Sequence, residues 1–198
     1  AGIEAALAPA RMNQKTVLVT SNFDNVGSLP CNTSIGGPAK GIIVREIDAL
    51  GGQMPKTADK TYLQMKMLNT AKGPGVQSLR AQADKKVYPR YMQEVLKKQE
   101  NLDIIEGMVE DLIVEDNCVK GVILDNGQTI EGRMVILTTG TYLKAEILCG
   151  DQKHASGPDQ QKESKYLSEK LANLGMRIQR LKTGTPPRVE INSVDYSK

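Results

Sequence analysis

Residues 1–20 read AGIEAALAPARMNQKTVLVT, and this stretch decides the fold class. Ile3, Leu7 and Met12 recur at roughly helical intervals with alanines between them, which predicts a helix. The β-branched run at residues 15–20 predicts a short buried strand. A helix followed directly by such a strand is typical of the middle of a βαβ unit. We therefore predict an α/β fold whose first strand and phosphate-loop glycines would precede this stretch.

Three further helices are predicted from apolar spacing and from glycine stop signals. The first covers residues 42–50 and ends at Gly51-Gly52. The second is one long helix over residues 79–96, because apolar or small residues recur there at every fourth position. The third covers residues 167–174 and ends at Gly175.

Between residues 102 and 137 the pattern changes to short strand-like runs separated by turn signals. Asp125-Asn126-Gly127 predicts a tight hairpin, because Asn and Gly tolerate the positive φ of a type I′ turn. We predict an antiparallel β-meander at about residues 107–133, which returns to a parallel core strand at residues 134–138. A parallel core sheet with an inserted antiparallel layer is common among flavoproteins with two dinucleotide-binding domains.

The composition is that of a soluble globular protein, since 39% of the 198 residues are hydrophobic and 25% are charged. No run approaches the roughly 18 apolar residues that a membrane helix needs, and the first residues do not resemble a signal peptide. Three cysteines and one histidine, His154, have no metal-ligand spacing. We therefore predict no metal site, no disulfide framework, no Ser-His-Asp chemistry and a reducing, cytoplasmic environment.

The charge balance permits a nucleic-acid partner without requiring one. The formal net charge is +3 at pH 7, which is mildly basic. Aromatic residues make up 4% of the chain and Trp is absent, which argues against a base-stacking platform.

Two glycine motifs favour a bound dinucleotide. Gly2 matches the last glycine of G-x-G-x-x-G, which lets a helix pack close to the first strand with its start facing a pyrophosphate. Any Ala-rich helix can begin in the same way. Residues 135–141 read as a hydrophobic strand that ends in Thr139-Gly140, where a glycine leaves room for a dinucleotide. The alternative is an ordinary strand and turn, but the two motifs together favour a flavin.

Cys31 is the most interesting single residue, because it lies in a polar, glycine-rich loop just before the second helix. Backbone N–H groups there would lower the pKa of a thiol and bind an anion or a flavin edge. The alternative is a small buried cysteine, which is the commoner fate of a lone Cys. Cys118 and Cys149 are interpreted as structural.

Two charged segments leave alternatives open. The first segment comprises Lys72-Gly73-Pro74-Gly75 and the charged residues 80–86. It would either bind a phosphate or substrate at a helix start or form a solvated face. Residues 182–188 hold two prolines between two cations. They would form a rigid interdomain crossing or a strand that contacts a ligand.

Eight stretches resemble the glucose-inhibited division protein A family, also called MnmG. They follow the family's order across essentially the whole chain, and several are too long to match by chance. The stretches are residues 1–12, 31–37, 44–52, 67–70, 80–84, 109–115, 137–143 and 182–188. On this resemblance the chain is identified as the amino-terminal, FAD-domain part of a member of the family.

The resemblance implies a fold, cofactors and partners. The fold would be a Rossmann-like FAD-binding domain of the glutathione-reductase type over residues 1–150, and residues 151–198 would begin the substrate and NADH side. The family uses FAD, NADH and a methylenetetrahydrofolate-derived carbon to install a (carboxymethyl)aminomethyl group at C5 of uridine 34 in tRNA. It works as a homodimer with the GTPase MnmE, away from membranes. This part alone is expected to be inactive.

The resemblance also implies roles for individual residues. Cys31 matches the family cysteine proposed to act in the uridine chemistry. Gly2 and Glu4 would belong to the helix that faces the pyrophosphate. Val109 would offer its backbone to the adenine, and Thr139-Gly140 would line the flavin. The residues expected near the isoalloxazine are Ser34, Gly36, Gly37, Arg80 and Gln82.

Two positions depart from the family's pattern. Thr33 stands where proline is usual, and Gln77 stands where arginine is usual, so these positions bear on loop rigidity and on an anion contact. Three other functions remain open: another FAD-dependent oxidoreductase, a relative of the folate-dependent tRNA methyltransferases, and a non-catalytic dimerisation domain. The loop at residues 31–37 and the segment at residues 183–188 favour the tRNA uridine modification enzyme.

Overall fold

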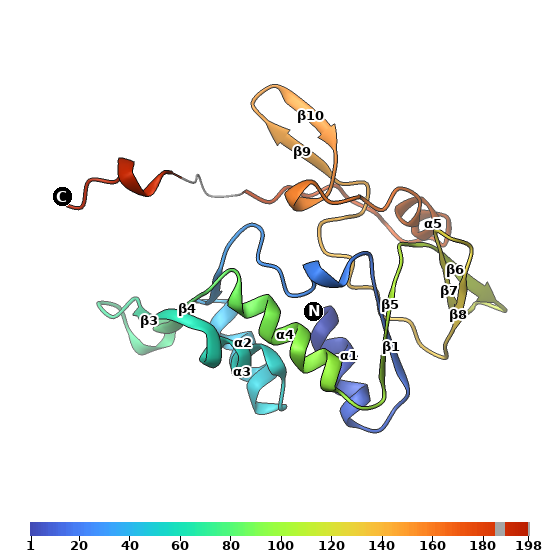
Figure 1. The fold of residues 1–198 in the computed structure, drawn as a ribbon, viewed down its shortest axis with the longest axis horizontal. Helices are drawn as coiled ribbons and strands as arrows, with labels where there is room; N and C mark the ends of the chain where they lie inside the picture. The colour runs from blue at the N-terminus through green and yellow to red at the C-terminus, as the bar shows by residue number, and fades with distance from the viewer. Residues whose placement is uncertain (185–188, 198) are drawn as a thin grey trace.

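The computed structural model describes residues 1–184 and 189–197, and helices alternate with small sheets along the chain (Figure 1). The helices are α1 (Gly2–Arg11), α2 (Lys40–Ala49), α3 (Gln53–Thr61), α4 (Val87–Lys98) and α5 (Leu167–Asn173). The strands are β1 (Thr16–Thr20), β2 (Ser34–Gly36), β3 (Tyr62–Leu68), β4 (Ser78–Ala83), β5 (Leu102–Glu106), β6 (Val109–Glu115), β7 (Cys118–Leu124), β8 (Thr129–Glu131), β9 (Glu146–Cys149) and β10 (Gln152–Ala155).

The strands of the described residues form four small sheets. β1 and β5 pair in parallel, with Thr16 opposite Leu102 and Thr20 opposite Glu106. β2, β4 and β3 form an antiparallel sheet in that order, and β6, β7 and β8 form an antiparallel meander. β9 and β10 form a hairpin that projects from the rest of the molecule (Figure 1). The predicted fold class, α/β with a parallel sheet and an inserted antiparallel meander, is confirmed.

The helix and strand predicted at the start of the chain are also confirmed. α1 buries Ala6, Leu7 and Ala10, and β1 follows after a short turn. The chain leaves β1, passes through α2, α3 and α4, and returns as β5, which is the long crossover that a parallel pair requires. Within the described residues β1 pairs only with β5, so its other edge has no strand beside it.

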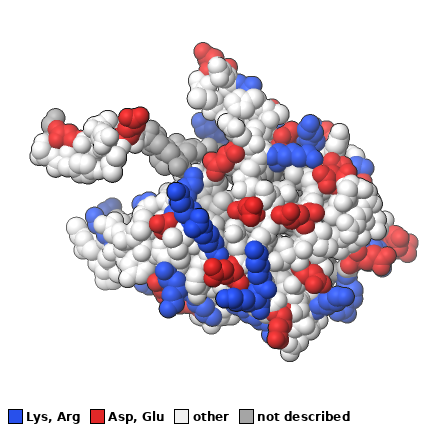
Figure 2. All heavy atoms as spheres, viewed as in Figure 1, with Lys and Arg blue, Asp and Glu red and all other residues white. Residues whose placement is uncertain are grey.

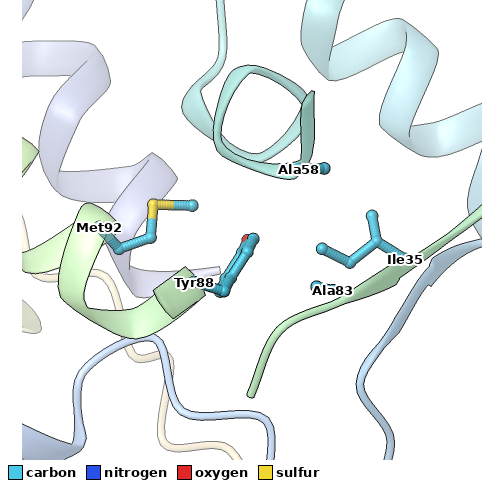
Figure 3. Close-up of a cluster of buried hydrophobic side chains, with 5 residues drawn as sticks. All are labelled: Ile35, Ala58, Ala83, Tyr88 and Met92. Atoms are coloured by element: carbon cyan, nitrogen blue, oxygen red, sulfur yellow. The ribbon is translucent and has the colours of Figure 1, made fainter. Parts of the chain in front are cut away.

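A first hydrophobic cluster holds α3 and α4 against the sheet formed by β2, β4 and β3. Its side chains converge from four elements (Figure 3) and are Ile35, Ala58, Ala83, Tyr88 and Met92. The alanines of α3 and β4 allow the helix to approach the sheet closely, while the Tyr88 ring fills the remaining space. Each large side chain buried in this way contributes roughly 1.5–3 kcal/mol.

A second hydrophobic cluster joins the meander to α5. Leu112, Val122 and Leu124 lie on one face of the meander, and Leu167 and Leu171 cover that face from α5. The predicted meander and the predicted last helix are therefore confirmed, and each is needed to bury the apolar side of the other.

The single long helix predicted over residues 79–96 is wrong. Residues 78–83 form β4, and α4 begins only at Val87. Asp84 separates them, because its carboxylate accepts hydrogen bonds from the backbone N–H groups of Val87 at 2.9 Å and Lys86 at 2.7 Å. These two bonds lower the pKa of Asp84. The four-residue spacing gave the wrong prediction because β4 is stabilised as a strand by β2 and β3 on either side. These partners lie elsewhere in the sequence.

The helix start predicted after Lys72-Gly73-Pro74-Gly75 is wrong for the same reason. This stretch belongs to the loop that joins β3 to β4, and a strand follows it. The Gln77 side chain closes the loop, since its Nε2 donates to the Lys72 carbonyl oxygen at 3.1 Å. The glutamine that departs from the family's pattern therefore has a local structural role.

The core strand predicted at residues 134–138 is wrong, because these residues pair with no strand of the described part. Met134 is 89% exposed and Ile136 is 66% exposed, so their apolar side chains do not form a core here. A strand requires a neighbour for its backbone hydrogen bonds, and local sequence does not supply that neighbour.

Asp125-Asn126-Gly127 joins β7 to β8 as predicted, but the turn is not of type I′. Only Gly127 has a positive φ, of +82°, and the Leu124 N–H donates to the Gln128 carbonyl oxygen at 2.9 Å. The connection is thus a three-residue loop with glycine in the left-handed position. Two consecutive positive φ values, as a type I′ turn requires, occur instead at Asp116 and Asn117, between β6 and β7.

Candidate functional site

A first cavity, cavity one, has a volume of about 320 Å³. Its walls come from the start of α1, the end of β1, the loop after β1, and parts of α3 and α4. The lining residues are Ala1, Gly2, Ile3, Glu4, Leu18, Val19, Thr20, Val26, Gly27, Ser28, Leu29, Met54, Tyr88, Met92 and Thr138. The cavity therefore gathers residues from the βαβ-like half of the chain around one helix start.

The first four residues of the chain, at the start of α1, line cavity one. The first helical hydrogen bond is donated by Ala5 to the Ala1 carbonyl oxygen at 2.9 Å, and Ala1 provides no side-chain cap. A Cβ at Gly2 would lie 2.8 Å from Thr138 Oγ1, so the glycine permits a close approach between α1 and this segment. A helix start of this kind attracts anionic groups.

The Glu4 carboxylate is turned toward the start of α3. It accepts hydrogen bonds from the Gln53 N–H at 2.8 and 2.9 Å and from the Met54 N–H at 2.5 Å. A negative charge at this position stabilises the helix start. At the other end of α1, Arg11 donates to the Gly51 carbonyl oxygen at 2.9 Å. Glu4 thus lines cavity one and also fixes the junction of α2 and α3.

Tyr88 connects cavity one to the first hydrophobic cluster. The residue is 3% exposed, and its ring lies among the cluster residues in Figure 3. Burial, with a smaller effect of the Glu4 charge, raises the pKa of Tyr88. Sequence reasoning missed this residue, although its spacing of four from Met92 was a signal for an inward helix face.

Cavity two, of about 290 Å³, lies between β2, the start of α2 and the β3–β4 pair. It brings together four of the predicted site residues, Ser34, Gly36, Gly37 and Arg80. Lys40 adds a second cation, and no carboxylate lines the cavity. The other lining residues are Asn32, Pro38, Ala39 and Leu68. An electron-rich or anionic ligand suits such a lining.

Gln82 is the fifth residue predicted near the isoalloxazine, and it lies behind cavity two. Ser34 Oγ donates to Gln82 Oε1 at 2.8 Å, and Arg80 Nη2 donates to Ser34 Oγ at 2.8 Å. Gln82 Nε2 in turn donates to Thr33 Oγ1. Thr33, the second departure from the family's pattern, therefore belongs to the hydrogen-bond network of the candidate site.

Cys31 lies close to the turn formed by Thr139-Gly140 but is not among the residues that line the two cavities. Burial raises the pKa of Tyr142, and the charges of Asp159 and Cys31 add to this effect. Tyr142 is part of the turn, since its N–H donates to the Thr139 carbonyl oxygen at 3.3 Å. The structure thus brings together Cys31 and the predicted flavin-lining turn beside a tyrosine that sequence reasoning missed.

The other residues singled out from the sequence lie elsewhere. Val109 begins β6 opposite Leu124 and packs against the second hydrophobic cluster, away from the lining of both cavities. Cys118 and Cys149 are exposed, so neither contributes to a buried core. Of the segment predicted to cross between domains or contact a ligand, residues 185–188 lie outside the described residues.

No group of three or more His, Cys, Asp or Glu residues is arranged to hold a metal ion in residues 1–184 and 189–197. Over the same ranges, no helix combines the length and the apolar character needed to span a bilayer.

The surface around α4 is rich in cations. Figure 2 shows Lys and Arg side chains gathered near the middle of one face, with some Asp and Glu among them. In the part of the chain that the structure describes, five cations in and just before α4 make no ion pair. They are Lys85, Lys86, Arg90, Lys97 and Lys98. The charges of Lys86 and Arg90 help to lower the pKa of Asp84, and Lys97 Nζ lies 5.0 Å from the centroid of the Phe23 ring. A group of cations that makes no close ion pair attracts a polyanion.

A parallel strand pair, a helix start facing a cavity and an inserted antiparallel meander together define an α/β fold of the dinucleotide-binding class. Comparison with known proteins then gives the particular family. The family model described as glucose inhibited division protein A matches residues 1–198. The chain belongs to this family.

Individual relatives agree with the family assignment. The tRNA uridine 5-carboxymethylaminomethyl modification enzyme MnmG of Geobacillus kaustophilus is 58% identical over 100% of this chain and 32% of its own length. The structure of Aquifex aeolicus GidA in its form II crystal matches with a TM-score of 0.94 and 48% identity, covering 99% of this chain and 32% of that one.

A more distant structure shares the fold alone. The GidA-related protein from Thermus thermophilus has a TM-score of 0.60 at 19% identity, over 88% of this chain and 64% of that one. The two curated relatives that are 57–58% identical to this chain are longer, and the chain spans 32% of their length.

Proposed function

We propose that this chain forms the FAD-binding part of an enzyme that adds a (carboxymethyl)aminomethyl group at C5 of wobble uridine 34 in tRNA. The observation that carries the proposal is the match over all 198 residues to a family whose similar members are named for this modification. High identity over the whole chain favours this function over another flavoprotein or a non-catalytic dimerisation domain.

The residues around cavity one fit a dinucleotide. The backbone N–H groups at the start of α1 would bind the pyrophosphate, and Gly2 leaves the space that this approach needs. Thr139-Gly140 and the residues of cavity two would contact the flavin, and the Val109 backbone would contact the adenine. When bound, FAD would accept electrons from NADH and handle a one-carbon unit derived from methylenetetrahydrofolate.

We assign residues 1–150 to the FAD-binding domain and residues 151–198 to the beginning of the substrate and NADH side. Among the described residues, one edge of β1 has no strand beside it, and residues 134–138 pair with no strand and expose Met134 and Ile136. Both features support a further strand between them, which would complete the parallel sheet and carry the phosphate-loop glycines.

Cys31 is the proposed catalytic residue. Its thiolate would add to C6 of the uracil ring, which makes C5 nucleophilic. After C5 has formed its new bond to carbon, loss of the C5 proton would break the S–C6 bond and release the thiolate and the modified uridine. The neighbouring Tyr142 hydroxyl donates to Gln161 Oε1 at 2.9 Å, which fixes the aromatic ring beside the thiol.

The proposed partners follow from the same function. The unpaired cations of α4 and the loop before it would contact the phosphates of tRNA. The full enzyme would act as a homodimer with the GTPase MnmE, and its tRNA substrate supports a cytoplasmic location.

The chemistry is tested by Cys31→Ser in the full-length protein, with Cys118→Ser as the matched control at an exposed cysteine. Both variants are produced in cells that lack the endogenous enzyme, and uridine 34 of their tRNA is analysed by mass spectrometry. We expect Cys31→Ser to retain FAD and to lose the modification, because serine is a far weaker nucleophile at neutral pH. Full modification by Cys31→Ser contradicts the thiol role.

A further inference from the structure

A directional chain of hydrogen bonds links Thr33 to Arg80 across β2 and β4. The antiparallel register places Ser34 opposite Gln82 and Gly36 opposite Arg80, so the side chains of both strands meet beside cavity two. Arg80 donates to Ser34 Oγ, Ser34 Oγ donates to Gln82 Oε1, and Gln82 Nε2 donates to Thr33 Oγ1. Every donor in the chain therefore points away from the cavity and toward Thr33.

The Gln82 amide lies between the hydroxyl groups of Thr33 and Ser34. The amide has a donor end and an acceptor end, and the Thr33 hydroxyl oxygen accepts from the donor end. The acceptor end is then presented to Ser34, whose O–H is used to donate to it. The lone pairs of Ser34 remain available to Arg80. Arg80 can only donate, so a reversed amide, which would donate to the same Ser34 oxygen, would leave the Ser34 O–H without its acceptor.

Arg80 depends on this chain for its position. Its side chain lines cavity two, and it makes no ion pair with any carboxylate of the described residues. Arginine has many rotamers, so one hydrogen bond to a fixed hydroxyl selects among them. Thr33 itself is not among the residues that line the cavity, so it acts on a ligand only through the other three residues.

We propose that Thr33 is a positioning residue, which holds the Arg80 guanidinium at the wall of cavity two through Gln82 and Ser34. The cation would there face the electron-rich polar edge of the flavin. This inference rests on the proposed FAD-binding function, because it takes FAD as the ligand. It adds to that function a residue that does not touch the cofactor.

The test compares Thr33→Val with Thr33→Ser in the full-length protein. Valine keeps the shape of threonine and removes the acceptor, whereas serine keeps the hydroxyl. We expect Thr33→Val to raise the dissociation constant of FAD about fivefold, the effect of one lost hydrogen bond, and Thr33→Ser to remain within about twofold of wild type. FAD affinity is measured by the quenching of flavin fluorescence.

A double-mutant cycle separates positioning from general packing. If Thr33 acts through Arg80, Thr33→Val has no further effect on FAD affinity in an Arg80→Gln background. Equal weakening in both backgrounds indicates a loss of strand packing and overturns the proposal. Unchanged affinity of Thr33→Val in the wild-type background overturns it as well.

A second measurement, which does not need FAD, tests the positioning role of Thr33 separately from the proposed FAD-binding function. If the wild-type protein binds no FAD, the proposed function fails, and the network is tested by NMR of the Arg80 guanidinium. Faster exchange of its Nη protons with water in Thr33→Val than in Thr33→Ser supports the positioning role. Equal exchange rates in the two variants overturn it.

Discussion

At the scale of single residues, Gly36 carries a strict backbone constraint in cavity two. Its φ is +94°, which L side chains rarely adopt, and a Cβ there would collide with the Leu79 carbonyl oxygen. We expect Gly36→Ala to lower the free energy of unfolding by about 1–3 kcal/mol, measured by urea denaturation. Gly75→Ala is the matched control, because nothing lies within 4 Å of its Cβ position. Equal losses in the two variants contradict this explanation.

Individual site residues differ in how far the sequence predicts them. Gly2, Gly36 and Gly37 are predictable, because glycine in a loop or at a helix start already implies a special backbone or a close approach. In the structure a close neighbour restricts Gly2 and Gly36, whereas Gly37 is restricted by its φ of +100°. Thr33 and Tyr142 were not predicted as site residues. Thr33 takes its role from a hydrogen bond with Gln82, and Tyr142 from an electrostatic interaction with Cys31, and no local pattern contains either.

At the scale of elements, α1 contains an unfavourable residue. Pro9 is the eighth residue of this ten-residue helix, so it cannot donate the hydrogen bond that the Ala5 carbonyl oxygen would receive. We expect Pro9→Ala to raise the free energy of unfolding, by up to about 3 kcal/mol, in a urea titration. Pro55→Ala is the control, because Pro55 lies in the first turn of α3, where its missing N–H has no helical acceptor. A stabilisation no larger than that of Pro55→Ala counts against this account of α1.

The elements themselves were predictable where their information is local. α1, β1, α2, the meander and α5 follow from apolar spacing and from glycine signals within each segment. β4 was predicted as helix because its partners, β2 and β3, are remote or were not predicted from the sequence. Residues 134–138 show the opposite case, in which a strand-like sequence has no partner among the described residues.

At the scale of the whole molecule, the two cavities lie on elements that two separate clusters hold in place. The first cluster fixes α3, α4 and the sheet behind cavity two. The second cluster joins the meander to α5, and Val19 of β1, which lines cavity one, packs against it. The fold class and the family resemblance could be predicted from the order of motifs along the chain. The arrangement of Cys31 beside Tyr142, and of Arg80 beside Ser34, required the structure.

The central claim is that the start of α1 seats the pyrophosphate of FAD, and the flavin content of the full-length protein tests it most directly. The protein is purified, its visible flavin absorbance is recorded, and FAD affinity is compared between wild type and Gly2→Val, with Gly75→Ala as control. A side chain at Gly2 would press on Thr138 at the rim of cavity one. We predict bound FAD in the wild type and in the control, and at least about tenfold weaker binding in Gly2→Val. A folded wild-type protein without FAD, or unchanged affinity in Gly2→Val, would contradict the account.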